Sequence, residues 1–148
     1  VLTGEYMAEK NKNKLLNLPF IALTIILIIY LIIAAILYII RPLSIAFFTN
    51  KPEIIERASS ILLLVLFTSI AQPFFEVAKF NLQAVGKEKI ALVITGVVNL
   101  LIFGVLIYLK QSSELNLKTI LLLLSCNYLV LYLIFTLFYR LEINKIIH

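Results

Sequence analysis

Four long apolar runs that contain no charged residue constrain this chain more than any other feature of its sequence. The residues that bound them are Lys14 and Arg41, Arg57 and Glu76, Lys89 and Lys110, and Lys118 and Arg140. About 20 helical residues cross a bilayer core of roughly 30 Å, and the runs are too continuous and too long for barrel strands. We therefore predict four transmembrane helices, over residues 18–40, 54–80, 90–109 and 119–138.

The composition agrees with a membrane protein and excludes an ordinary soluble domain. Apolar residues make up 62% of the 148 residues and charged residues only 14%, against about 25% charged residues in soluble domains. The short links between the runs make successive helices antiparallel. The expected fold class is therefore all-α, a polytopic transmembrane bundle of four antiparallel helices in one region, residues 1–148, with the lipid bilayer as its surroundings.

The net charge of +5 belongs to helix ends rather than to a nucleic-acid surface, because the basic residues lie between the apolar runs. With four spans, both ends of the chain lie on one side of the membrane. The basic residues on that side are Lys10, Lys12, Lys14, Lys87, Lys89, Arg140 and Lys145, and those on the other side are Arg41, Lys51, Arg57, Lys110 and Lys118. This excess predicts cytoplasmic ends. The abundance of Lys, Asn and Ile is typical of an AT-rich bacterial genome, so we expect a bacterial plasma (inner) membrane.

The sequence offers no set of residues for catalysis. Cys126 is the single cysteine and His148 the single histidine, so no disulfide, metal cluster or nucleophile–base pair is assembled. There is also no glycine-rich phosphate loop. We expect no enzyme, no metal and no cofactor.

Polar residues inside the runs are the candidate functional residues. Five polar residues follow one another at steps of three and four residues, which places them on one helix face: Thr68, Gln72, Glu76, Lys79 and Gln83. Polar groups at membrane depth need partners or water, so this face is interpreted as the wall of a cavity in which Glu76 takes up a proton or binds a cation. The alternative is an i,i+3 ion pair between Glu76 and Lys79 that reaches the membrane interface.

Three further residues are singled out in the runs. Asn99 and Asn127 are candidates for the same pathway, although we favour a hydrogen bond between helices for both. Pro73 removes one backbone hydrogen bond and predicts a kink in the second helix. That kink either bends during transport or shapes the packing.

Three stretches carry a resemblance to a known family. They are residues 2–11 (LTGEYMAEKN), residues 47–58 (FFTNKPEIIERA), and residues 72–75 (QPFF) followed by 81–87 (NLQAVGK). In this order and spacing the chain resembles MATE-type multidrug exporters of the MOP flippase superfamily, over about residues 2–109.

This resemblance implies one part of a twelve-helix transporter with two lobes. The chain ends after residues 139–142 in a short polar tail, so we expect the last four helices of the C-terminal lobe, with the other helices of the same transporter as partners. The implied function is secondary active export of drugs or small organic cations in exchange for protons or sodium. The alternatives are a lipid-linked oligosaccharide flippase of the same superfamily and a non-transporting four-helix membrane scaffold.

Overall fold

The computed structural model describes residues 5, 12–113 and 115–147 of the chain. Its elements are helices α2 (Lys12–Ile39), α3 (Arg41–Ala46), α4 (Pro52–Ser69), α5 (Ala71–Ala84), α6 (Glu88–Gln111) and α7 (Leu117–Ile147). Within these ranges the chain forms no strand. The predicted all-α fold class is confirmed.

Four helical segments are long and apolar enough to cross a membrane. They are Asn13–Ile39, Pro52–Ala84, Glu88–Gln111 and Leu117–Lys145, and the second of them consists of α4 and α5 in succession. The first and last helices continue beyond the predicted ranges into segments that carry charges. Long basic side chains allow this, because their charged ends reach water while their stems stay in the apolar layer.

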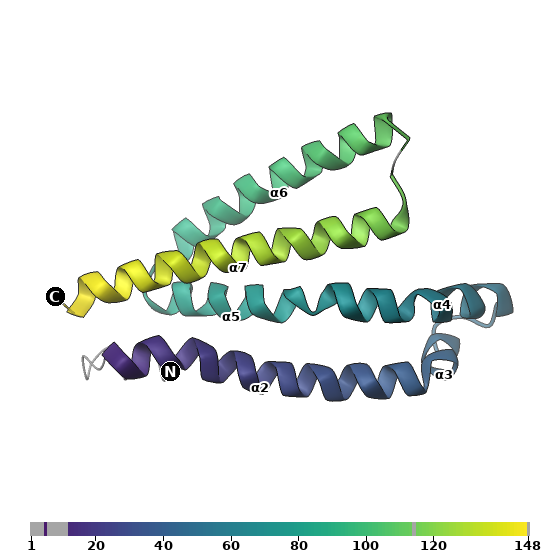
Figure 1. Cartoon of the computed structure of the whole chain (residues 1–148), viewed down its shortest axis with the longest axis horizontal. Coiled ribbons are helices and arrows are strands. Elements are labelled where there is room, and N and C mark those ends of the chain that lie inside the picture. The colour runs from purple at the N-terminus through teal and green to yellow at the C-terminus, as the bar shows by residue number, and fades with distance from the viewer. Residues whose placement is uncertain (1–4, 6–11, 114, 148) are drawn as a thin grey trace.

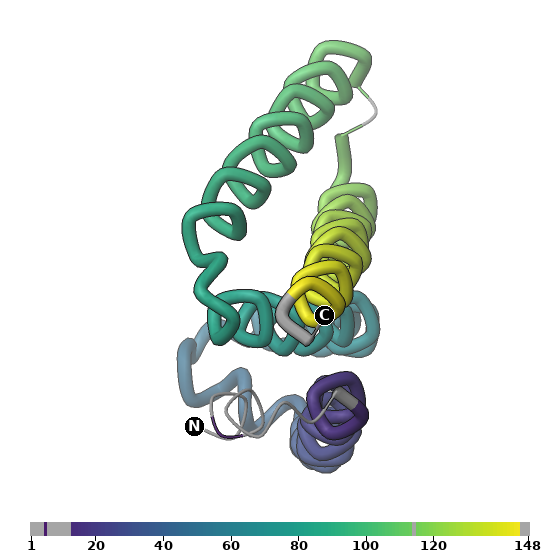
Figure 2. Tube along the Cα trace, turned by 90° about the vertical axis from the view of Figure 1, so that its left-hand side faces the viewer, coloured from purple at the N-terminus to yellow at the C-terminus, as the bar shows by residue number. Residues whose placement is uncertain are grey.

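Successive spans run in opposite directions (Figure 1). α2 and α6 run one way, and α4–α5 and α7 run the other, so α5 and α7 are parallel. The start of α2, the α5–α6 turn and the end of α7 lie together, and we call this the terminal end of the bundle. Seen along the bundle, α6 stands apart from α2, while α5 and α7 are side by side (Figure 2).

The core lies between α5 and α7, which share the most extensive contact in the described structure. Each helix supplies a row of buried side chains at steps of three or four residues, namely Phe75, Ala78 and Leu82 from α5 and Leu131, Phe135, Tyr139 and Ile143 from α7, joined by Leu15 from α2. In lipid the hydrophobic effect does not drive helices together, so close packing of such rows holds them.

Two connections shape the ends of the spans. α3 occupies the link between the first two spans, where the sequence indicated only that one helix stops and another starts. It begins at Arg41 and has Pro42 in its first turn, where the missing N–H of proline costs no helical bond. At the terminal end, Gly86 has a φ of +76°.

The turn at Gly86 closes α5 with two backbone bonds. Gly86 N–H donates to the Gln83 carbonyl and Lys87 N–H donates to the Leu82 carbonyl. This pair of bonds is the Schellman pattern, which glycine favours because it has no Cβ. The turn fixes Lys87 next to the end of α7.

Candidate transport site

The predicted polar stripe begins at Thr68 on α4, and its other four members lie on α5. Gln72 is exposed, while Glu76, Lys79 and Gln83 are half-buried. The stripe runs beside the row of core residues rather than within it, because its members are offset by one position from Phe75, Ala78 and Leu82 on the same helix. It therefore forms a polar edge along the α5–α7 core.

Glu76 and Lys79 form an ion pair one turn apart on this stripe. The Lys79 Nζ lies 2.5 Å from Glu76 Oε2, and the exposed fractions of the two side chains are 26% for Lys79 and 35% for Glu76. The same ammonium group lies 5.0 Å from the ring centroid of Phe75 and 5.2 Å from that of Phe80. Aromatic faces attract cations, so Lys79 is held by a carboxylate and two rings at once.

The second span is interrupted just before the stripe. α4 ends at Ser69 and α5 begins at Ala71, while Ile70 between them keeps right-handed helical angles, with φ −60° and ψ −24°. Pro73 has no N–H to donate to the Ser69 carbonyl, and a proline ring crowds the carbonyl four residues earlier. The interruption therefore coincides with the carbonyl that Pro73 leaves without its helical partner.

Asn99 and Asn127 meet between α6 and α7. The Asn127 Nδ2 donates to Asn99 Oδ1 over 3.0 Å, which is the interhelical bond favoured from the sequence. Asn127 is only 6% exposed, and its Oδ1 has no hydrogen-bond partner in the described structure. The pair thus leaves one buried acceptor unused in the middle of α7.

An aromatic layer lies beside both polar groups. Phe75 stacks in a tilted arrangement against Tyr128 at 5.5 Å and Phe135 at 5.8 Å, and Phe74 meets Tyr132 edge-on at 5.4 Å. Phe75 precedes Glu76, and Tyr128 follows Asn127. No hydrogen bond or ion pair among the described residues joins the α5 stripe to the asparagine pair, so the structure keeps them as two groups separated by rings.

Two polar residues of the second span are satisfied locally. The buried Asn81 donates to the Val77 carbonyl over 2.7 Å, and the buried Thr68 donates to the carbonyls of Leu64 and Val65. Asn81 was not singled out from the sequence. Its place opposite the Gln72–Gln83 stripe follows from helical spacing, but its burial depends on packing against neighbouring helices.

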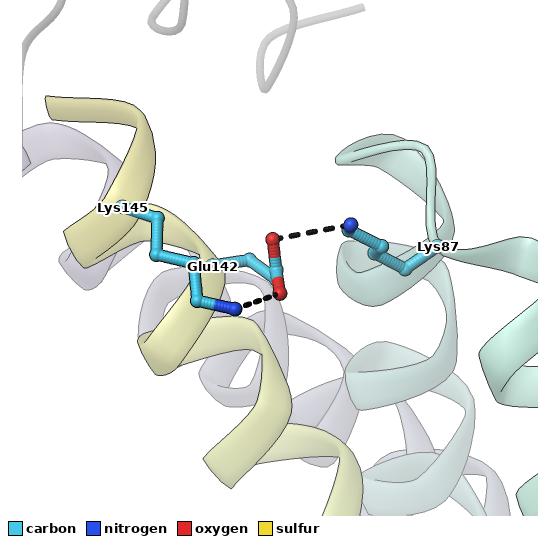
Figure 3. Close-up of polar contacts among 3 residues, drawn as sticks. All are labelled: Lys87, Glu142 and Lys145. Carbon is cyan, nitrogen blue, oxygen red and sulfur yellow. Dashed lines mark hydrogen bonds and ion pairs between the residues drawn. The ribbon is translucent and has the colours of Figure 1, made fainter.

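A charged cluster at the terminal end was also missed. The Glu142 carboxylate binds Lys87 of the α5–α6 turn at 3.2 Å and Lys145 of α7 at 3.0 Å (Figure 3). Nearby, the Tyr139 hydroxyl donates to the Leu15 carbonyl over 2.8 Å. The i,i+3 spacing of Glu142 and Lys145 is visible in the sequence, whereas Lys87 is brought to them only by the fold.

Comparison with known proteins identifies the family. The MatE family model matches residues 1–109, which include α2 to α5 and most of α6 but not α7. The search of curated proteins and the search of solved structures give no match. Because the family match spans well over half of the chain, this multi-pass membrane protein belongs to the MatE family of transporters.

Proposed function

We propose that this chain forms part of a secondary active transporter that exports organic cations, drugs among them, in exchange for protons or sodium ions. Membership of the MatE family supports a transporter, and the arrangement of α5 supports cation coupling. In this proposal the chain supplies helices nine to twelve of a twelve-helix protein in a bacterial plasma membrane, with both ends of the segment in the cytoplasm.

The observation that carries the proposal is the Glu76–Lys79 ion pair within the candidate membrane span Pro52–Ala84. Glu76 lies about 12 Å along the helix from Ala84, at a rise of about 1.5 Å per residue. Ionised groups within spans are costly and mark ion pathways. Here the Lys79 ammonium group neutralises the Glu76 carboxylate. A proton or a sodium ion that binds Glu76 takes the place of Lys79.

Such an exchange of partners provides a switch. When a coupling ion neutralises Glu76, Lys79 loses its counter-charge and shifts toward water or toward the rings of Phe75 and Phe80. A positive charge that appears on this face repels a cationic substrate from it. Binding of ion and substrate is then mutually exclusive, as exchange requires. Gln72 and Gln83 provide neutral hydrogen-bonding groups along the same face, and Asn99 and Asn127 a second polar position on the pathway.

The test is Glu76→Gln in the intact protein, with uptake and efflux of a fluorescent organic cation followed in proteoliposomes under an imposed proton or sodium gradient. We expect gradient-driven efflux to fall about 5- to 150-fold, the range of typical coupling energies between two ligands. Glu53→Gln is the matched control, because Glu53 is exposed in the first turn of α4 at the opposite end of the span. It should transport normally.

Unchanged efflux for Glu76→Gln at every pH and sodium concentration would remove Glu76 from the mechanism. A protein that moves no cation in either form, but assembles stably in the membrane, would instead favour the scaffold.

A further inference from the structure

A small cavity lies at the terminal end of the bundle, on the side away from the asparagine pair. It has a volume of about 110 Å³ and lies between α2, α5 and α7. Pro19, Phe20 and Leu23 of α2 line one wall, and Tyr132, Thr136 and Arg140 of α7 line the other. None of these residues belongs to the polar stripe of α5.

The cavity carries one charged residue, Arg140, and its other lining residues are uncharged. α2 and α7 run in opposite directions (Figure 1), and the bond from the Tyr139 hydroxyl to the Leu15 carbonyl places Arg140 level with the start of α2. Tyr132 lies eight residues earlier on α7, about 12 Å deeper along the helix. The cavity lining thus runs from the charged Arg140 near the terminal end, past Thr136, to Tyr132 deeper in the bundle, where no charged residue lines it.

Arg140 is available to a negatively charged ligand. Glu142 is the only acidic residue of α7, and its carboxylate binds Lys87 of the α5–α6 turn and Lys145 of α7 itself (Figure 3). Arg140 itself is exposed and has no ion pair within residues 12–113 and 115–147. The two lysines thereby bind the one carboxylate of this helix, and no carboxylate among the described residues pairs with the Arg140 guanidinium.

We propose that this cavity binds an anionic phospholipid, with the phosphate on Arg140 and part of one acyl chain between α2 and α7. An apolar cavity of about 150 Å³ admits benzene, so 110 Å³ holds a short portion of a chain. The remainder lies in the bilayer along α2, where Phe20 is 73% exposed. Guanidinium groups bind phosphate through paired hydrogen bonds, and basic positions at the cytoplasmic surface attract anionic lipids.

The site is distinct from the proposed transport function. Val77 and Ala78 of α5 line the cavity, but no residue of the polar stripe does, and the lipid chain lies between α2 and α7. Lipid binding can therefore be tested without any measurement of transport.

The experiment is native mass spectrometry of the purified protein with phosphatidylglycerol or phosphatidylcholine of identical acyl chains. We expect a preference for phosphatidylglycerol that Arg140→Gln reduces about fivefold, the contribution of one basic residue to binding of an anionic membrane lipid. Arg140→Lys should keep most of the preference. Lys89→Gln is the matched control, because it removes the same charge from an exposed position at the same end of the bundle but outside this cavity.

Two further arms separate a lipid from a free phosphate. Glycerol 3-phosphate, which carries the phosphate without a chain, should not displace the lipid. Thr136→Phe, which fills the cavity and keeps every charge, should weaken binding of phosphatidylglycerol. An equal loss in Arg140→Gln and Lys89→Gln, displacement by glycerol 3-phosphate, or undiminished binding to a folded Thr136→Phe protein would each overturn the proposal.

Discussion

At the scale of single residues, Asn127 links two spans that have few other polar contacts. Its side chain is buried and donates to Asn99, which is exposed on α6. Side-chain hydrogen bonds between membrane helices contribute less than their low-dielectric surroundings suggest, because the separated helices find other partners. The Asn127 bond therefore helps to orient α6 against α7 more than it stabilises the whole bundle.

A double-mutant cycle measures this bond. We expect Asn127→Ala and Asn99→Ala to be coupled by about 0.6 kcal/mol and at most about 1.7 kcal/mol, the range for such bonds in membrane proteins. The free energy of unfolding of the two single variants and the double variant, followed by circular dichroism in detergent, gives the coupling. Strictly additive losses would show that the two amides do not interact in solution, and Ser125→Ala serves as a neighbouring control on α7.

The polar residues also show how far the sequence alone predicts a site. Steps of three and four residues place Gln72, Glu76, Lys79 and Gln83 on one face of any regular helix, so their alignment is predictable. The exposed fraction of each of these side chains is not predictable from the sequence, since it depends on how far α5 is rotated toward α7. Glu142 illustrates the same limit, because its contact with Lys87 requires two helices and a turn to be placed correctly.

At the scale of elements, the four spans are predictable because a charge-free run of about 20 residues has one favourable arrangement in a bilayer. The short α3 is not predictable, since six residues that include Pro42 contain too little pattern. The sequence also does not predict which helices pack against each other. The most extensive contact joins α5 and α7, which are parallel and not consecutive, whereas short links suggest only that consecutive helices are neighbours.

The interruption between α4 and α5 can be tested by restoring the missing donor. Pro73→Ala supplies an N–H for the Ser69 carbonyl, and we expect α4 and α5 to become one continuous helix. Amide hydrogen exchange of residues 69–75 should then slow about tenfold, equivalent to one added bond of about 1.4 kcal/mol. Pro52→Ala is the control, because Pro52 is the first residue of α4 and its N–H would lie outside the helix.

Exchange that stays equally fast in Pro73→Ala would show that tertiary packing, and not proline, sets the interruption. Transport by the same variant separates the two roles of the kink. Loss of turnover with unchanged substrate binding identifies a bend needed during the cycle, and normal turnover identifies a static feature of packing.

At the scale of the whole molecule, the four helices leave much apolar surface uncovered. Exposed large apolar side chains recur along α2 from Phe20 to Ile39 and along α6 from Leu92 to Tyr108, and the α5 stripe lies at an edge rather than in an enclosed cavity. Lipid covers apolar faces without cost, but it does not solvate Glu76 and Lys79. A pathway for cations therefore needs further protein opposite this edge, which in the proposed twelve-helix transporter is the role of the remaining helices.

A polar edge that needs further protein implies a native polypeptide longer than this chain. Twelve spans of about 20 residues with their links require a protein about three times as long as these 148 residues. An immunoblot of source membranes with an antibody raised against the segment around Arg140 measures that length directly, and a band of the longer size supports the two-lobe antiporter. A band at the size of this chain alone would mean that the polar edge of α5 is completed by other subunits. Cross-linking through a cysteine placed at Gln72, in a Cys126→Ser background, would then have to capture a second polypeptide.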